Sequence, residues 1–431
     1  MTDYDVIVLG GGLAGLAGAR DLSNAGKAVA LVEARDRLGG RVLTRRLPST
    51  SMPIELGPEW VDDSEELAPL LARRGSRLLE AEGSRWTRTN GALQRGDDEM
   101  GALASVIGQL DDAGGADHSL RDSLAALNGV NDTQKQLLVN YVAGFHAADP
   151  ARVSTRWLRQ AQRAAPPDAS GYRAFGGLDR AIDTLRDNLA ASCDVRLGTT
   201  ALEVRWRPGR VNVTVGSAGN ERETLQARQL LVTLPLALLK ASTDERGAIR
   251  FLPALVEKRD ALAALDTGNV VKIALIFRDP IWRGDTKLED MLFLHDFTQP
   301  FPTWWTGVQS DAPLLLGWSA GPQAERLREH RADLTKPAIA SLASALGMTA
   351  RTVRDQLIDA VACDWSTDEL ARGGYSYVLA GGTGAPAELA RPIQRTIYFA
   401  GEATVTGGLN ATTHGALRSG ERAAREILEP G

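Results

Sequence analysis

The feature that most constrains the fold of this chain is a strand, a glycine-rich turn and a helix near its N-terminus. Residues 5–9, DVIVL, form an apolar run that predicts a buried parallel strand. The turn GGGLAG, residues 10–15, opens a helical pattern that stops near Gly26. A second apolar run, AVALV, leads into Glu33, which lies 18 residues after Gly15. This β-α-β unit with G-x-G-x-x-G and a following acid matches the dinucleotide-binding fingerprint.

Each part of the fingerprint has a physical task. Gly10 permits the tight turn, Gly12 lets the backbone approach a pyrophosphate, and Gly15 allows the helix to pack closely on the strand. The helix N-terminus offers free N–H groups to the phosphates. Glu33 would accept hydrogen bonds from ribose hydroxyls. The fingerprint alone leaves both NAD and FAD open as the dinucleotide.

Length and composition indicate a globular protein with more than one compact unit. A chain of 431 residues exceeds one ordinary core. The net charge of -5 gives no general attraction to nucleic acid or to an anionic membrane, and no run of 18 apolar residues is present to span one. Cys193 and Cys363 are the only cysteines and have no zinc-ligand spacing, so we expect no metal site, no disulfide and a reduced, cytoplasmic setting.

Four separated blocks of sequence resemble the flavin-containing amine oxidase superfamily. Directly after Glu33, the segment from Arg37 to Thr44 carries the pattern R-x-G-G-R-x-x-T. The other blocks are IELGPEWVD at 54–62, CDWSTDELARGGYSY at 363–377 and RTIYFAGEAT at 395–404. The resemblance implies that the cofactor is FAD. It also implies noncovalent binding, because the position of the flavin-linked cysteine in mitochondrial monoamine oxidases falls at Gly374.

The resemblance assigns cofactor contacts in every block. Arg41 would pair with the pyrophosphate, Glu402 would contact the ribityl chain, and Trp365 would lie beside the flavin ring. Val204 would contact adenine through its backbone. The helix after Thr412 would point its positive end at the flavin N1 and O2 region, where negative charge appears on reduction. The full set of expected cofactor-binding residues is Gly10, Gly12, Leu13, Ala14, Gly15, Glu33, Ala34, Arg35, Gly39, Gly40, Arg41, Gly57, Pro58, Glu59, Trp60, Val204, Trp365, Tyr375, Gly401, Glu402, Ala411 and Thr412.

One lysine stands inside an apolar run that predicts a buried strand. Lys272 is the only charged residue in GNVVKIALIF, residues 268–277. A buried ammonium needs a partner, a lowered pKa or a wet cavity, because removing an isolated charge from water is costly. The resemblance implies that Lys272 is the catalytic lysine that holds a water against flavin N5. The alternative is a strand lysine whose ammonium reaches solvent.

The resemblance also implies an aromatic substrate pocket. Trp60 and Asp62 would line the substrate tunnel, although a solvated turn acid is the alternative for Asp62. Tyr375 would form one aromatic wall. The second aromatic wall of monoamine oxidases is a tyrosine at the position of Thr412. Because threonine has no ring, the substrate pocket would have only one aromatic wall. His146 is a further expected pocket residue, with a hydrogen-bonded structural histidine as the alternative. The other aromatic candidates for the pocket have a place in the core as their alternative, and they are Phe175, Trp282, Trp304, Trp305 and Trp318.

These assignments predict an α/β fold in which a Rossmann-like FAD-binding domain is joined to a second, α+β substrate-binding domain. Both units are discontinuous in the chain. The FAD-binding unit is expected to comprise residues 1–75, 173–245 and 390–431. The substrate-binding unit is expected to comprise residues 76–172 and 246–389.

The expected reaction is hydride transfer from the carbon next to an amine nitrogen onto flavin N5. Water would hydrolyse the resulting imine, and oxygen would recycle the flavin and leave as hydrogen peroxide. The expected partners are a small-molecule amine and oxygen, without nucleic acid or membrane, and a homodimer is left open. An L-amino-acid oxidase is an alternative, with Arg173 as the carboxylate clamp. A carotenoid-type or porphyrinogen-type desaturase and a non-catalytic flavin-binding protein are further alternatives.

Overall fold

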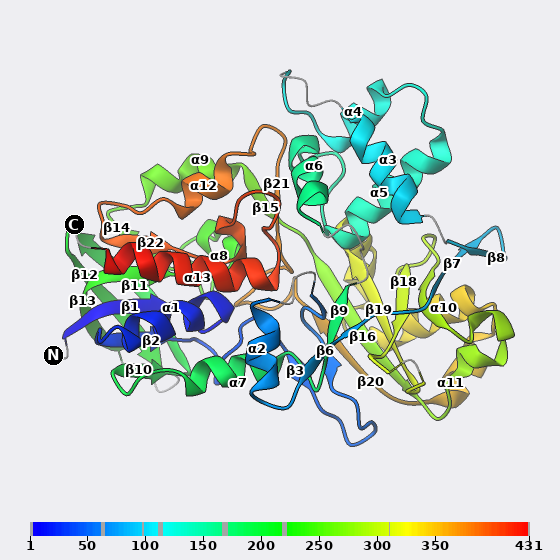
Figure 1. The fold of residues 1–431 in the computed structure, drawn as a ribbon, viewed down its shortest axis with the longest axis horizontal. Coiled ribbons are helices and arrows are strands. Elements are labelled where there is room, and N and C mark those ends of the chain that lie inside the picture. Colours follow the sequence, from blue (N-terminus) through cyan, green and yellow to red (C-terminus); the bar gives the residue numbers. More distant parts are fainter. Residues whose placement is uncertain are drawn as a thin grey trace.

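The structure is a computed structural model that describes residues 3–61, 65–96, 99–110, 115–165, 171–217, 222–309 and 311–429. Two large β-sheets lie at opposite ends of an elongated molecule, and a group of helices stands beside the second sheet (Figure 1). Among the described residues, no helix combines the length and the apolar character needed to cross a membrane.

The first sheet contains the predicted nucleotide-binding strands. Its order is β10-β2-β1-β13-β12-β11-β14, and β22 pairs with β13. The pairs of β1 with β2 and with β13 are parallel, whereas β11, β12 and β13 form an antiparallel meander. The bounds are β1 (Asp3–Leu9), β2 (Val29–Val32), β10 (Cys193–Arg196), β11 (Thr199–Arg207), β12 (Arg210–Ser217), β13 (Arg222–Val232), β14 (Arg250–Leu252) and β22 (Ile397–Phe399). Strands β11 and β12 form an antiparallel hairpin.

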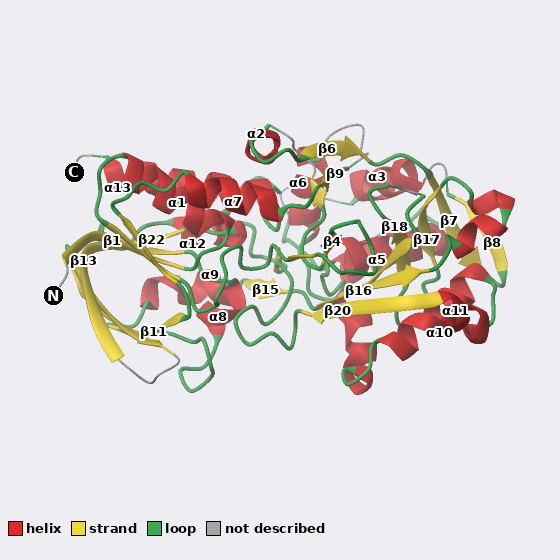
Figure 2. Ribbon diagram, turned by 90° about the horizontal axis from the view of Figure 1, so that it is seen from below, coloured by secondary structure: helices red, strands yellow, loops and turns green. Residues whose placement is uncertain are grey.

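Both faces of the parallel strands are covered, which explains their continuous apolar runs. Helices α1 (Leu13–Asn24), α7 (Asp179–Asp187) and α13 (Thr413–Leu428) lie along one face (Figure 2). The side chains of β11 and β12 cover the other. Helices α1 and α13 pack backbone against backbone, because a Cβ added at Gly420 would lie 2.1 Å from the carbonyl oxygen of Ala14.

The second sheet carries the lysine strand. Its order is β20-β16-β19-β18-β17-β7-β8. The bounds are β7 (Ser84–Thr89), β8 (Ala92–Arg95), β16 (Val270–Phe277), β17 (Met291–His295), β18 (Thr303–Thr306), β19 (Leu314–Ala320) and β20 (Leu357–Asp364). Because side chains alternate along a strand, Ile273 and Leu275 pack toward α10 (Thr335–Leu346) and α11 (Ala350–Gln356). Lys272 therefore shares the opposite face, which meets the segment around residues 52–60.

The remaining elements connect the two sheets or form the helical group. The small sheet β5-β9-β6 and the pair β3-β4 lie between the large sheets (Figure 2). Their bounds are β3 (Thr44–Arg45), β4 (Ile54–Glu55), β5 (Trp60–Val61), β6 (Arg77–Glu80) and β9 (Tyr172–Phe175). The other elements are α2 (Leu67–Ala72), α3 (Glu99–Gln109), α4 (Leu120–Ala126), α5 (Asp132–Phe145), α6 (Thr155–Ala164), α8 (Leu236–Lys240), α9 (Arg259–Ala263), α12 (Ala385–Ala390), β15 (Leu265–Thr267), β21 (Ser376–Val378), η1 (Val256–Lys258), η2 (Ile281–Gly284), η3 (Thr286–Leu288), η4 (Gly321–His330) and η5 (Glu402–Thr404).

Candidate active site

The glycine-rich turn has the close backbone geometry that a dinucleotide site needs. Gly10 has φ of 101°, a conformation that favours glycine. A Cβ added at Gly15 would lie 1.8 Å from the carbonyl oxygen of Gly10, so no other residue fits there. Gly12 caps α1 without a side-chain hydrogen bond, which leaves the first N–H groups of the helix for an anion. The turn therefore fits the pyrophosphate of FAD.

Glu33 is fixed at the end of β2 with its carboxylate toward the turn. Its Oε2 accepts a hydrogen bond of 2.7 Å from the N–H of Gly11, and its Oε1 accepts one of 2.8 Å from the N–H of Arg35. A carboxylate can accept about four hydrogen bonds, so two further positions are available for ribose hydroxyls. Two backbone hydrogen bonds thus hold the predicted acid against the glycine-rich turn.

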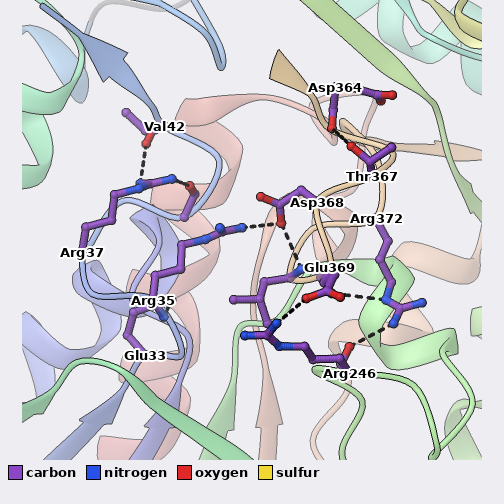
Figure 3. A network of polar contacts seen from close by, with 12 residues as sticks. Glu33, Arg35, Arg37, Val42, Arg246, Asp364, Thr367, Asp368, Glu369 and Arg372 are labelled. Carbon is purple, nitrogen blue, oxygen red and sulfur yellow. Dashed lines mark hydrogen bonds and ion pairs between the residues drawn. The ribbon is translucent and has the colours of Figure 1, made fainter. Parts of the chain in front are cut away.

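Figure 3 shows that the loop after β20 is tied to the nucleotide motif by an ion pair. Arg35 Nη2 lies 2.6 Å from Asp368 Oδ1. Burial alone would raise the pKa of Asp368, but the hydrogen bond and charge of Arg35 outweigh burial and lower that pKa. Arg37 donates to three backbone carbonyls of its own turn, including that of Val42 at 3.1 Å. The pair of Arg35 with Asp368 joins two segments that are 333 residues apart in sequence.

Arg41 and Glu402, which were predicted to bind different parts of FAD, contact each other. Arg41 Nη1 lies 3.0 Å from Glu402 Oε1 and donates to the carbonyl of Gly374 at 2.6 Å. Glu402 Oε2 accepts hydrogen bonds from Ser376 Oγ at 2.6 Å and from the N–H of Ala411 at 3.1 Å. Glu402 therefore joins the segments that carry Tyr375 and Thr412, the two predicted wall positions.

Lys272 is buried in an ion pair. Its side chain is 1% exposed, and Nζ lies 2.7 Å from Glu59 Oε2. Nζ also lies 3.4 Å from the carbonyl oxygen of Gly57 and 5.1 Å from the ring centroid of Trp305. The predicted burial of Lys272 is confirmed. The partner differs from expectation, because Glu59 was assigned only as a cofactor contact.

A second buried cation accompanies Lys272. Arg173 is 3% exposed, and its Nη1 donates to the carbonyl of Thr306 at 2.6 Å. The same nitrogen lies 3.5 Å from Glu59 Oε1, and the guanidinium stands over the Trp60 ring at 4.9 Å. Burial lowers the pKa of Arg173, although Glu59 opposes that shift. Nη1 thus has internal partners, whereas Nε is buried without a hydrogen-bond partner among the described residues.

A second buried carboxylate lies on the same segment as Glu59. Glu55 accepts hydrogen bonds from Thr44 Oγ1 at 2.9 Å and from the N–H of Leu178 at 2.7 Å. Burial raises the pKa of Glu55 from 4.5 to about 7, and these hydrogen bonds together with the charge of Lys272 limit the rise. No role was predicted for Glu55 from the sequence. The only feature of the sequence that could have indicated a buried carboxylate here is the position of Glu55 within an apolar strand.

Three aromatic side chains are anchored near the lysine strand. Trp365 donates through Nε1 to the carbonyl of Leu56 at 2.8 Å, and Trp318 donates to the carbonyl of Gly144 at 2.9 Å. Tyr375 donates through its hydroxyl to the carbonyl of Phe145, and burial raises the pKa of that hydroxyl. All three pack in one cluster around Val270. The predicted residues Trp318, Trp365 and Tyr375 are thus brought together.

The other predicted pocket residues have varied positions. Trp60 stacks on Phe293 with ring centroids 5.1 Å apart and lies 6.1 Å from Trp305. Thr412 caps α13 and accepts a hydrogen bond of 3.0 Å from the N–H of Gly415. Phe175 lies under the Arg77 guanidinium at 5.5 Å, with no contact to Lys272 in the described part of the chain. Asp62 lies outside the described residues.

His146 ends α5 within an aromatic group. Its ring meets those of Phe145, Tyr141 and Trp157 edge to face at 5.1 to 5.5 Å. Burial lowers the pKa of His146 to about 4, so the ring is neutral at neutral pH. Trp282 and Trp304 belong to the core beneath the second sheet, as the core alternative expected. Val204 is buried in the core of the first sheet.

Comparison with known proteins identifies the relatives of this arrangement. A family model described as flavin containing amine oxidoreductase matches residues 13–428. Polyamine oxidase 3 of Oryza sativa subsp. japonica is 27% identical over 97% of this chain and 88% of its own length. Lysine-specific histone demethylase 1 homolog 2 of Arabidopsis thaliana is 28% identical over 99% of this chain, which spans only 59% of that relative.

Solved structures share the fold across the whole chain. Wild-type putrescine oxidase bound to putrescine has a TM-score of 0.79 at 22% identity and 99% coverage of both chains. Cyclohexylamine oxidase from Brevibacterium oxydans has a TM-score of 0.80 at 21% identity and the same coverage. These likenesses confirm the predicted fold class. Together with the family match, they also confirm the resemblance read from the sequence blocks.

Proposed function

This chain belongs to the flavin-containing amine oxidoreductases, and from that premise we propose that it oxidises a small amine with bound FAD and oxygen. The chemistry supplied by bound FAD is two-electron oxidation of the C–H bond next to the amine nitrogen, with oxygen as the final acceptor and hydrogen peroxide as its product. Water then hydrolyses the imine to a carbonyl compound and an amine or ammonia. The substrate identity and the regiochemistry are left to experiment.

The observation that carries this proposal is the buried ammonium of Lys272 on the sheet face that also bears Trp305 and Trp318. Lys272 pairs across the sheet with Trp318, so the two side chains share one face. In the proposed role, Nζ holds a water by hydrogen bonding and presents positive charge where negative charge develops. The surrounding aromatic surface favours an uncharged amine, which keeps the nitrogen lone pair available.

The contacts of Arg173 favour an amine over an amino acid as substrate. A carboxylate clamp needs a guanidinium whose charge is not already shared with a buried anion. Arg173 is buried, donates to Thr306 and faces Glu59, so a substrate carboxylate would compete with a buried anion. We therefore place the L-amino-acid oxidase second.

Several finer assignments complete the proposal. We infer noncovalent FAD, because a Cβ added at Gly374 would lie 2.4 Å from Val270 Cγ2 and leaves no room for a linking cysteine. We also infer the division into an FAD-binding unit and a substrate-binding unit at the boundaries expected from the sequence. Cys193 and Cys363 are free, which fits a reduced, cytoplasmic setting.

One experiment tests the proposed function. The purified protein is checked for a flavin spectrum and then mixed without oxygen with monoamines, putrescine, spermidine, cyclohexylamine and amino acids. We expect at least one amine to bleach the flavin, and readmitted air to restore the colour with release of peroxide. Bleaching by amino acids alone would favour the second candidate. No bleaching by any compound would leave the non-catalytic flavin-binding alternative.

A further inference from the structure

The acid Glu59 binds the buried lysine and is itself surrounded by donors from three strands. Its Oε2 accepts from Lys272 Nζ on β16 at 2.7 Å and from Trp305 Nε1 on β18 at 3.1 Å. Its Oε1 faces Arg173 on β9 at 3.5 Å. The carboxylate is 4% exposed. It therefore links the segment between β4 and β5 to both the small sheet and the second large sheet.

The contacts of Lys272 show how this acid would direct the ammonium. An ammonium group has three N–H donors. Within the described residues, Glu59 and the carbonyl of Gly57 provide two acceptors, at 2.7 and 3.4 Å. One donor is thus left for a water or a product. Without the acid, only the longer hydrogen bond and the contact with the Trp305 ring would oppose movement of the ammonium.

Charge gives the acid a second task. Lys272 and Arg173 bring two positive charges to a buried place, and Glu59 supplies one negative charge between them. The group then carries one net positive charge. Removal of Glu59 would leave two buried cations without the counter-charge that they share, which is costly in a medium of low dielectric constant.

We propose that Glu59 is a positioning residue that fixes the Lys272 ammonium and limits the positive charge beside the flavin. This inference rests on the proposed function, in which Lys272 faces the flavin. Loss of the acid should misplace the ammonium and slow the reaction of the reduced flavin with oxygen. It should also raise the reduction potential of the bound flavin, because uncompensated positive charge favours the reduced form.

The test uses the FAD-loaded protein reduced by light, so that no amine is needed. The variants are Glu59→Gln, Lys272→Met, the double variant and Asp296→Asn. Asp296 is a matched control, because it is also a buried carboxylate but bonds Thr298 and Ser344 rather than a lysine. For each protein, we measure the reduction potential by dye equilibration and the rate of reoxidation by oxygen.

We expect Glu59→Gln to raise the potential and slow reoxidation at least tenfold. Lys272→Met should lower the potential, the double variant should be no slower than Lys272→Met, and Asp296→Asn should stay within threefold of wild type. A Glu59→Gln protein with wild-type potential and rate would overturn the proposal. So would additive effects of the two single substitutions, since residues acting as a unit are not additive.

A variant that loses FAD or fails to fold still decides the question. If the defect of Glu59→Gln comes from two unbalanced cations, Lys272→Met should restore folding and FAD binding in the double variant. If the double variant also fails to fold or to bind FAD, the proposed pairing of Glu59 with Lys272 is wrong. Failure of every amine to reduce wild type would instead refute the proposed function and leave these measurements valid.

Discussion

Replacing Glu55 with glutamine should change how the stability of the protein depends on pH. Glu55 is 5% exposed and accepts hydrogen bonds from Thr44 and Leu178. Burial raises its pKa from 4.5 to about 7. Both hydrogen bonds end on Oε1, so a glutamine amide oxygen at that place can accept both, and the amide does not titrate. The substitution therefore isolates the cost of ionising this buried carboxyl.

The sign and size of the effect follow from proton linkage. The folded protein binds the Glu55 proton more tightly than the unfolded chain does, so the free energy of unfolding falls as pH rises from about 4.5 to about 7. One pKa unit corresponds to about 1.4 kcal/mol, so a rise from 4.5 to about 7 corresponds to roughly 3 kcal/mol. Relative to wild type, Glu55→Gln should gain roughly that much stability between pH 4.5 and pH 8.

The assay is urea unfolding of the FAD-loaded proteins at several pH values across this range. His146, whose pKa burial lowers to about 4, gives wild type an opposite trend, since its stability contribution grows with pH. That trend is common to both proteins and cancels in their difference. The control is Asp355→Asn, an exposed acid on α11. A difference between Glu55→Gln and wild type that does not vary with pH would refute the reasoning.

Three further predictions concern the cofactor site. Asp368→Asn should weaken FAD binding about fivefold, because the partly buried ion pair with Arg35 is lost. The control Glu369→Gln removes an exposed ion pair with Arg246 and should leave FAD affinity unchanged, and flavin fluorescence titration measures both affinities. Gly15→Ala should abolish FAD binding because its Cβ would meet the backbone, whereas an alanine at Gly108 meets open space and should leave the flavin spectrum unchanged. Trp365→Phe should cost about 1 to 3 kcal/mol in urea unfolding, because the buried carbonyl of Leu56 loses its indole donor.

Local patterns in the sequence predicted the elements that depend on near neighbours. The strand, turn and helix from β1 through α1 to β2 follow from apolar periodicity and glycine spacing within about thirty residues. The burial of Lys272 follows from its apolar run. Its partner does not, because Glu59 lies 213 residues away and no local pattern encodes such a contact. The sequence indicated only that a buried lysine needs a negatively charged partner, and not which residue supplies it.

The phase of a short strand also limited the prediction. Trp304 and Trp305 are neighbours on β18, so their side chains point to opposite faces. Trp304 fills the core beneath the sheet, whereas Trp305 reaches Glu59 beside the lysine. An apolar strand buried on both faces offers no polar alternation that would distinguish them. The contact between Arg41 and Glu402 was not predicted for a different reason, since it joins residues 361 positions apart in sequence.

The most direct test of the account is the turnover of Lys272→Met with the amine that best reduces wild type. We expect this variant to keep its flavin spectrum while reoxidation by oxygen falls at least tenfold. Lys258→Met is the control, since Lys258 is also buried but donates to the carbonyl of Glu388; it should stay within twofold of wild type. Normal reoxidation and peroxide release by Lys272→Met would contradict the account.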